Sequence, residues 1–409
     1  MKNVLKIIIL TIFITTFCTS LIAGESELII EKLVEKEIIT PVEGQILLDE
    51  ANKAKAEEDA LAQKVKIKGD LRSRFQSEKK ANDNYTRNRM RVRARLGIEG
   101  SINDKFSAFL GLCTGGTDPR STNQTFDNGF STKGINLDYA YFSWEINSNI
   151  SLYGGKIVRK KVLWQPSDLL WDGDINTEGF ALLLNQSINE NLDVFFNTSY
   201  FVLDEIKTDN ADIDMVVFQP GIQFQLSEAM SLKTAIGIYN FNNFKGKADQ
   251  ANMTGSSGTN TNAVGIYSYD YNISNLSFQL DWKKPIGFFD YAALFGDYIQ
   301  NPDSDIALDE SKTGYLIGIK FGDSKIGKTG TWQAKVMTRS LGKDAWVDFL
   351  SDSDFYGGAT GYQGTEFVFS YALAKNAVLG FDYYSTNGIK NQGVDNAQNL
   401  YQLDLKLKF

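Results

Sequence analysis

From residue 64 to the C-terminus, apolar and polar residues alternate in repeated runs of roughly ten residues. The last run is the clearest, because Leu403, Leu405 and Leu407 are separated by the charged residues Asp404 and Lys406. A period of two places successive side chains on opposite faces of a β-strand. A run of this length also matches a tilted strand that crosses a bilayer. No run of 18 apolar residues occurs in this region, so we expect strands rather than membrane helices here.

The number and spacing of these runs predict how the strands are connected. Short links, such as 101–104 and 189–190, alternate with long links, such as 115–134 and 242–271. A transmembrane antiparallel β-barrel has this alternation, with short periplasmic turns and long outer loops, and an even count places both termini in the periplasm. A soluble sandwich or propeller has no need of it. We count 16 runs, which begin near Lys64, Arg87, Lys105, Asn136, Ile150, Glu178, Asn191, Asp212, Met230, Ile273, Gly287, Thr313, Gly330, Thr365, Ala377 and Leu400.

The first two runs carry a row of cations on one face, and Asp70 is the single carboxylate among them. A lipid-facing arginine near the bilayer centre costs about 2–4 kcal/mol, so the row cannot face outward. Burial in a dry, unpaired interior is worse still. We therefore predict a wide, water-filled lumen. The predicted pore-lining residues are Lys64, Lys66, Lys68, Arg72, Arg74, Arg87, Arg89, Arg91, Arg93 and Arg95.

A cationic pore wall predicts a preference for anions. The alternative is a row that facing carboxylates neutralise, which gives a transverse field without strong selectivity. Lys156, Lys335 and Arg339 are candidates to extend the basic side. The candidate neutralising residues are Asp172, Asp174, Asp281, Asp382 and Asp404.

The segment Ser167–Asp174 is polar and aromatic, and we expect it to fold into the lumen as a constriction. Its candidate constriction residues are Asp168, Trp171, Asp172 and Asp174. Asp172, Gly173 and Asp174 also resemble part of a calcium loop, but no bidentate acid follows at the required spacing. We interpret the segment as a turn and predict no metal ligands. Several tyrosines and tryptophans of the runs, such as Tyr139 and Trp144, are candidates for aromatic girdles.

The residues ahead of the strands predict two further regions. Residues 1–23 have the basic start and apolar centre of a secretory signal peptide, with cleavage after Ala23 or Ser20. Residues 24–63 have helical spacing, and Thr40, Pro41 and Glu43 form a helix-start signature. We expect a short periplasmic helical segment there, and the barrel over residues 64–409.

Composition excludes several functions. The sequence contains no His, so nucleophilic triads, zinc-protease sites and barrel-borne phospholipases are excluded, and we predict no catalytic residues and no cofactor. The formal net charge of −8 argues against nucleic-acid binding. Cys113 is the one cysteine beyond the signal peptide, so no intrachain disulfide is expected and the residue should pack as a small apolar group. Pro220 lies inside the eighth run, where we expect a β-bulge.

Four stretches together resemble the putative porin family, which is similar in style to the phosphate-selective porins O and P. They are residues 32–51, 87–97, 137–141 and 168–179. The resemblance implies a 16-stranded general porin that forms a homotrimer. Phe409 is similar to the C-terminal aromatic residue that the outer-membrane assembly machinery recognises. No counterpart of a phosphate-binding lysine set is found.

These observations predict a porin of the bacterial outer membrane, in contact with its lipid. It would form a water-filled channel for passive diffusion of small hydrophilic solutes and ions. The alternative is a closed outer-membrane barrel with a structural, adhesion or envelope-anchoring role, in which the acidic residues 24–63 would be the active part. An enzyme is not expected. A plugged 22-stranded transporter is excluded because residues 24–63 are too few for its plug.

Overall fold

The structure is a computed structural model that describes residues 28–208, 211–287, 289–393 and 396–409, without the side chains of residues 54–63 and Ile286. The predicted signal peptide lies outside the described residues. The chain forms two compact units, Met1–Lys66 and Ile67–Phe409. Within the described ranges, no helix combines the length and the apolar character that a bilayer crossing requires.

In the first unit, residues 28–35 are helical and α2 (Pro41–Lys64) follows. Thr40 caps α2: its side chain accepts from the backbone N–H of Glu43, while its own N–H donates to the Glu43 carboxylate at 2.8 Å. The predicted capping box is therefore present. Gly44 brings the two helices together, because a Cβ there would lie 2.5 Å from the Val34 side chain.

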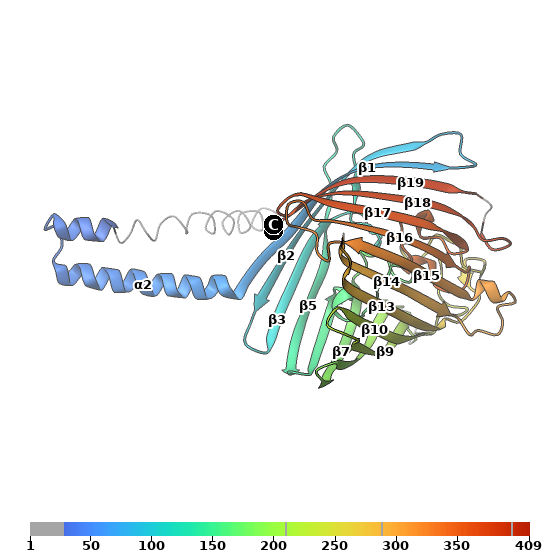
Figure 1. The fold of residues 1–409 in the computed structure, drawn as a ribbon, viewed down its shortest axis with the longest axis horizontal. Helices are drawn as coiled ribbons and strands as arrows, with labels where there is room; N and C mark the ends of the chain where they lie inside the picture. The colour runs from blue at the N-terminus through green and yellow to red at the C-terminus, as the bar shows by residue number, and fades with distance from the viewer. Residues whose placement is uncertain (1–27, 209–210, 288, 394–395) are drawn as a thin grey trace. The chain divides into compact units, whose positions relative to one another are not determined.

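The second unit is a closed antiparallel β-barrel of 16 strands (Figure 1). Closure is made by β1, which pairs with both β2 and β19. Every strand begins within three residues of a predicted run, so the strand count and spacing are confirmed. The strands are β1 (Val65–Lys80), β2 (Arg87–Ser101), β3 (Phe106–Thr114), β5 (Ile135–Asn147), β6 (Ile150–Ile157), β7 (Thr177–Asn189), β8 (Leu192–Asp204), β9 (Ile213–Gln225), β10 (Met230–Asn242), β13 (Asn272–Ile286), β14 (Phe289–Gln300), β15 (Thr313–Gly322), β16 (Trp332–Leu341), β17 (Tyr362–Ala374), β18 (Ala377–Gly388) and β19 (Gln398–Lys408).

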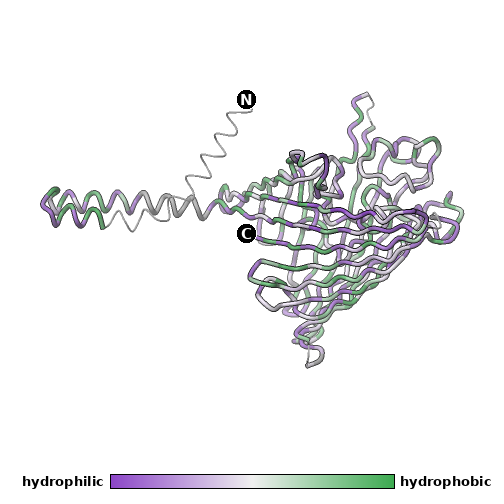
Figure 2. The backbone as a smooth tube through the Cα atoms, turned by 90° about the horizontal axis from the view of Figure 1, so that it is seen from above, coloured by the Kyte–Doolittle hydropathy of each residue, from purple (hydrophilic) through white to green (hydrophobic). Residues whose placement is uncertain are grey.

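The two faces of the barrel wall differ in chemistry, and Figure 2 shows hydrophobic and hydrophilic residues alternating along the strands. On β19, Leu403 and Leu405 are exposed on the outer face, whereas Gln402 and Asp404, which alternate with them, are buried inside. On β15, Tyr315, Ile317 and Ile319 are likewise exposed. A row of exposed apolar side chains around a closed sheet is what a hydrocarbon environment requires.

The long connections fold inward. Residues 158–176 bond to three well-separated strands: Trp164 to Gln219 on β9, Ser167 to Asp297 on β14, and Asp174 to Arg95 on β2. Such partners can be reached only across the barrel interior. Short elements lie in these connections, namely β4 (Gln124–Thr125), η1 (Arg159–Lys161), β11 (Asn262–Ala263), β12 (Ile266–Tyr267), η2 (Asp309–Ser311), η3 (Asp348–Leu350) and η4 (Tyr356–Gly358).

Three of the inward connections, residues 158–176, 243–271 and 342–361, share an apolar core with the barrel wall. The indole of Trp346 lies at its centre, 5.2 Å from the ring of Tyr239 and 5.8 Å from that of Trp171. All three rings are 1% exposed or less. Edge-to-face packing of such large rings stabilises the connections in one arrangement. The barrel therefore contains a packed aromatic core beside β5 to β16 and charged side chains along β17 to β3.

Two local predictions differ from the structure. At Pro220 no bulge forms: β8 and β9 stay in register, with Phe196 opposite Pro220, and β9 and β10 keep one register on either side of it. The missing N–H of proline therefore interrupts the β9–β10 ladder without shifting it. At the start of the barrel, Lys64 is the last residue of α2 rather than the first of a strand.

We predict that Leu403→Arg, in the middle of β19, lowers the free energy of unfolding in phospholipid vesicles by about 2–4 kcal/mol, since the new charge would meet hydrocarbon. Leu407→Arg, on the same face near the strand end, should cost no more than about 1 kcal/mol. Urea unfolding followed by tryptophan fluorescence measures both. Equal losses would contradict a membrane-facing β19.

Candidate functional site

The cations of β1 lie on the inner face, and two of them are buried among carboxylates. Arg74 is 2% exposed and faces Asp404 on the neighbouring strand β19, with Nε–Oδ1 and Nη2–Oδ2 distances of 2.7 and 2.8 Å. Asp354, from the connection 342–361, lies 3.3 Å from its third nitrogen. Arg72 lies 3.7 Å from Asp404 and also donates to Asn123. A forked guanidinium–carboxylate pair is strong and fixes direction as well as distance.

The arginines of β2 continue the same surface. Arg93 donates to Asp70 on β1 at 2.7 Å, and Arg95 donates to Asp174 of the inward connection 158–176. Arg89 lies 3.2 Å from Glu78. These side chains are less buried than those of β1, since the side chain of Arg95 is 26% exposed. The arginine row is thus partly exposed inside the barrel, but carboxylates stand close to most of it.

The remaining cations of the predicted row lie in different settings. Arg91 has neutral partners, Gln76 and Ser121. Lys68 is exposed and pairs with Glu99 at 3.3 Å, and Arg87 is exposed at the start of β2. Lys64 and Lys66 belong to the first unit, together with α2, and are exposed there. The structure therefore brings together seven of the ten cations, namely Arg72, Arg74, Arg87, Arg89, Arg91, Arg93 and Arg95, on β1 and β2.

Of the five candidate neutralising carboxylates, three contact the row. Asp404 and Asp174 do so directly, and Asp382 on β18 lies 4.0 Å from Arg74. Asp281 instead accepts from Gln279 and Tyr291 on the other side of the barrel. Asp172 accepts backbone N–H bonds within the connections. Sequence could not rank these five, because the partner of a luminal charge depends on strand order.

The predicted constriction residues lie inside the barrel but differ in environment. Trp171 is 1% exposed within the aromatic core, so its indole is buried. The Asp172 carboxylate accepts the backbone N–H groups of Asp174 and Ser353, both at 2.8 Å, which fastens connection 158–176 to connection 342–361. Burial and the charge of Asp174 raise the pKa of Asp172 to about 7. Burial also raises the pKa of Asp174, but Arg95, Arg93 and Arg72 outweigh it and hold that pKa at about 2.

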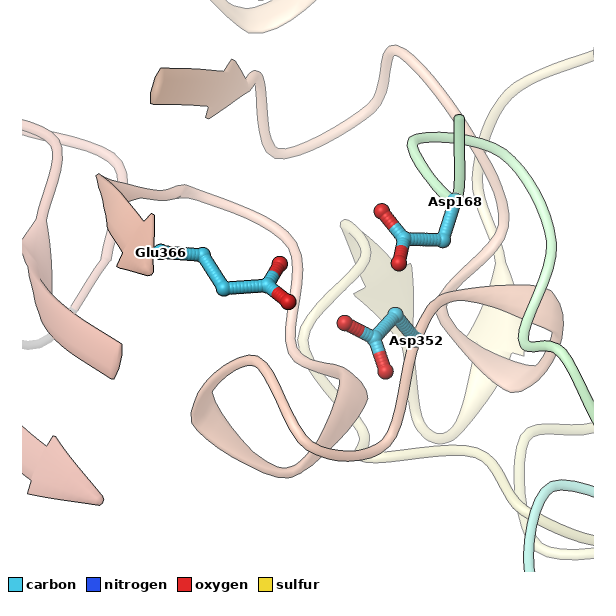
Figure 3. A group of neighbouring side chains, drawn as sticks. All are labelled: Asp168, Asp352 and Glu366. Atoms are coloured by element: carbon cyan, nitrogen blue, oxygen red, sulfur yellow. The ribbon is translucent and has the colours of Figure 1, made fainter. Parts of the chain in front are cut away.

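Asp168 converges with Asp352 and Glu366, three residues from two connections and from β17 (Figure 3). Each offers one oxygen, and these lie within 4.8 Å of one another. Oxygen groups of this kind suit Ca²⁺, but Arg339 already stands 3.6 Å from Asp352. Burial and the adjacent Asp168 raise the pKa of Asp352 well above its ordinary value, so a proton can also relieve the repulsion. Sequence analysis missed this cluster because its members are far apart in the chain.

A second set of cations that sequence analysis missed lies where connection 158–176 begins. Arg159, Lys160 and Lys161 form η1, and Lys233 on β10 lies near them. Arg159 is 3% exposed, donates to Gln165 and the Asp172 carbonyl, and stacks over Trp171 at 5.4 Å. Burial lowers the pKa of Arg159 to about 10. The run Arg159-Lys160-Lys161 is visible in the sequence. It lies in a connection, however, where no alternation of polar and apolar residues shows which way a side chain points.

A closed barrel of 16 antiparallel strands, apolar outside and charged inside, defines a transmembrane barrel of the porin type. The family model described as putative porin matches residues 72–268 and 261–409, and the chain belongs to this family. The family and the fold are those of outer-membrane channels, which are in general not enzymes. No curated protein matches the sequence.

Solved structures share the fold at low identity. OprB of Pseudomonas putida has a TM-score of 0.55 at 10% identity, covering 87% of this chain and 96% of its own. A triple mutant of Rhodopseudomonas blastica porin has a TM-score of 0.45 at 11% identity, covering 84% and 100%. OmpF of Salmonella typhi, in complex with daunomycin, has 0.48 at 12%, covering 84% and 97%.

The buried Arg74–Asp404 pair gives a direct test of the wall. Arg74→Met alone should lower the free energy of unfolding by about 3–5 kcal/mol, because it leaves Asp404 without its forked partner. Arg74→Met with Asp404→Leu should lose less than the sum of the two single changes. Lys68→Gln, in an exposed pair, should cost less than about 1 kcal/mol. Urea unfolding in detergent measures all four variants, and additive losses would show that the pair is not coupled.

The Asp172 carboxyl makes stability depend on pH. Its pKa is about 7 in the folded chain, against about 3.9 for an unfolded aspartate. The folded state therefore binds more protons between these values, and stability should fall as pH rises from about 4 through 7. Asp172→Asn should flatten this fall in the urea midpoint, whereas Asp104→Asn, at an exposed turn, should leave it unchanged. A wild-type midpoint that rises with pH in this window would contradict the assignment.

Proposed function

We propose that this protein forms a water-filled outer-membrane channel for passive diffusion of small hydrophilic solutes and ions. The observation that carries the proposal is the inward arginine row of β1 and β2. Exposed apolar residues occupy the opposite face of the same strands, such as Leu71 and Phe75 on β1. In a barrel with a wholly dry interior, burying these charges would cost free energy that a water-filled interior avoids.

The diffusion path we propose follows the charged side of the lumen, between the wall from β17 to β3 and the inward connections. The aromatic core occupies the other side. A cavity of about 250 Å³ opens along the proposed path, bordered by Asp138, Lys156 and Asp174 among others. The carboxylates and cations that face one another across this path would produce a transverse field.

This arrangement supports a weak anion preference. Most of the arginine row has a carboxylate nearby, so the wall contributes little net charge. The cations of η1 and Lys233 have none within 4 Å among the described residues, and they would supply the bias toward anions. We therefore propose that this set adds to the preference for anions, while the arginine row produces the field and balances the carboxylates that face it.

Assembly and export are part of the same proposal. Residues 1–23 would direct secretion, and Phe409 would be recognised by the outer-membrane assembly machinery. We propose that the mature protein is a homotrimer in the bacterial outer membrane and that residues 24–63 remain in the periplasm as a helical segment. Cross-linking in membranes would test the trimer.

The aromatic core favours a second candidate function, a closed barrel with a structural or anchoring role. Three connections fill part of the lumen with buried rings, including Trp171, Phe244 and Trp346. A barrel closed in this way would support only negligible ion current. Planar-bilayer recording distinguishes the two functions, because the channel requires a large, steady conductance.

In a KCl gradient, we predict that replacing Arg91, Arg93 and Arg95 with Gln shifts the reversal potential toward cations. The physical reason is that Asp70 and Asp174 lose their partners while three positive charges disappear from the wall. A control with Gln at Lys105, Lys284 and Lys375, which are exposed at or beside short connections, should leave the potential unchanged. Equal potentials in all three proteins would remove the row from the selectivity mechanism.

A further inference from the structure

Beneath the first part of connection 158–176 lies a cavity of about 350 Å³ that the arginine row does not border. Its lining combines the η1 residues with side chains of β7, β8 and β10, and contains four bases and no Asp or Glu. Cavities of this size hold small molecules. The lining strand residues lie in the half of the barrel toward the short connection 190–191, which follows β7.

The bases of this cavity have no ion-pair partner in the part of the chain that the structure describes. In the described chain, Arg159, Lys160, Lys161 and Lys233 have no carboxylate oxygen within 4 Å. Arg159 is only 3% exposed, and its Nε has no hydrogen-bond partner among the described residues. Burying a guanidinium without a carboxylate in direct contact is costly. A bound anion would offset that cost and the mutual repulsion of the four charges.

Two aromatic rings form the other part of the cavity. Trp164 and Phe195 meet edge to face with centroids 6.3 Å apart, and the Lys233 ammonium lies 5.0 and 4.7 Å from them. Phe195 lies flat over Gly221, where a Cβ would come within 2.1 Å of the ring. A cation beside a ring face selects ligands that have both a negative charge and a flat group.

The position of the Trp164 indole is fixed by hydrogen bonds between Gln219 and the Trp164 backbone. Gln219, which is fully buried on β9, accepts from the Trp164 N–H at 2.9 Å and donates to the Trp164 carbonyl at 2.7 Å. It also accepts from Asn197 at 3.0 Å, so both of its polar atoms are used. The backbone that carries the Trp164 ring is therefore fixed to the barrel wall.

We propose that this cavity binds a small organic anion, in which a carboxylate or phosphate is attached to a flat ring, with the anion on the η1 lysines and Lys233 and the ring on Trp164. This inference rests on the proposed function, because it makes such anions the preferred solutes of the proposed channel. It adds a solute class and a binding site to simple diffusion.

Equilibrium calorimetry on the full refolded chain in detergent tests the binding, with benzoate as the probe and inorganic phosphate as the ringless comparison. Benzoate should bind more tightly than phosphate. Replacing Lys160, Lys161 and Lys233 together with Gln should lower the affinity for both anions by about tenfold or more. The Gln control at Lys105, Lys284 and Lys375 should bind both as the wild type does.

Trp164→Ala separates the ring from the charge. It should weaken benzoate severalfold and leave phosphate unchanged, because only benzoate has a ring to pack there. If the wild type shows no heat of benzoate binding, the inference is wrong. The inference is also wrong if the triple variant and its control bind benzoate equally. An equal loss of both anions in Trp164→Ala would likewise contradict it.

Bilayer recording distinguishes this inference from the proposed function. Millimolar benzoate should reduce the chloride current of the wild type and much less that of the triple variant. Steady conductance without benzoate binding would contradict the site alone. Benzoate binding in calorimetry without conductance would contradict the channel and leave the site standing.

Discussion

A row of guanidinium groups can be kept inside a closed sheet only if water or opposite charges stand close to most of it. In this barrel the condition is met from two directions. Asp404 faces Arg74 from the neighbouring strand, and Asp174 and Asp354 reach Arg95 and Arg74 from inward connections. The first type of partner belongs to the wall, and the second couples the wall to the loops. The charge pattern of β1 and β2 therefore determines where the loops can lie.

The interior consequently has two parts with different physics. On one side, aromatic packing around Trp346 holds three connections together, and the carboxylates of Asp344 and Asp348 accept hydrogen bonds from connection 243–271. On the other, ion pairs of Asp174 and Asp354 join two of these connections, 158–176 and 342–361, to the arginine wall. The aromatic core gives rigidity, whereas the charged side remains partly hydrated and titratable. The proposed solute path therefore lies between two walls. Apolar packing fixes the groups of one wall, and ion pairs fix those of the other.

Strand number, strand starts and the inward direction of the arginines followed from the sequence because a period of two is imposed by the backbone itself. The alternation of short and long links came from the same periodicity. The contacts of connections did not follow, since no period assigns a loop residue to a face. Arg159, Lys160 and Lys161 were therefore overlooked, and Trp171 was placed at a constriction although it is buried in the aromatic core. Pro220 was expected to bulge, but the neighbouring ladder tolerates one missing donor.

The central claim is that alternate residues of β2 face water and hydrocarbon, and thiol labelling tests it most directly. Single cysteines at Arg91 or Arg93 and at Met90 or Ala94 would be placed in a chain that lacks residues 1–23 and carries Cys113→Ser. After reconstitution into vesicles, a charged, water-soluble thiol reagent should modify the first pair rapidly and the second pair hardly at all. Equal modification of both pairs, or faster modification at Met90 and Ala94, would contradict a hydrated arginine face inside the barrel.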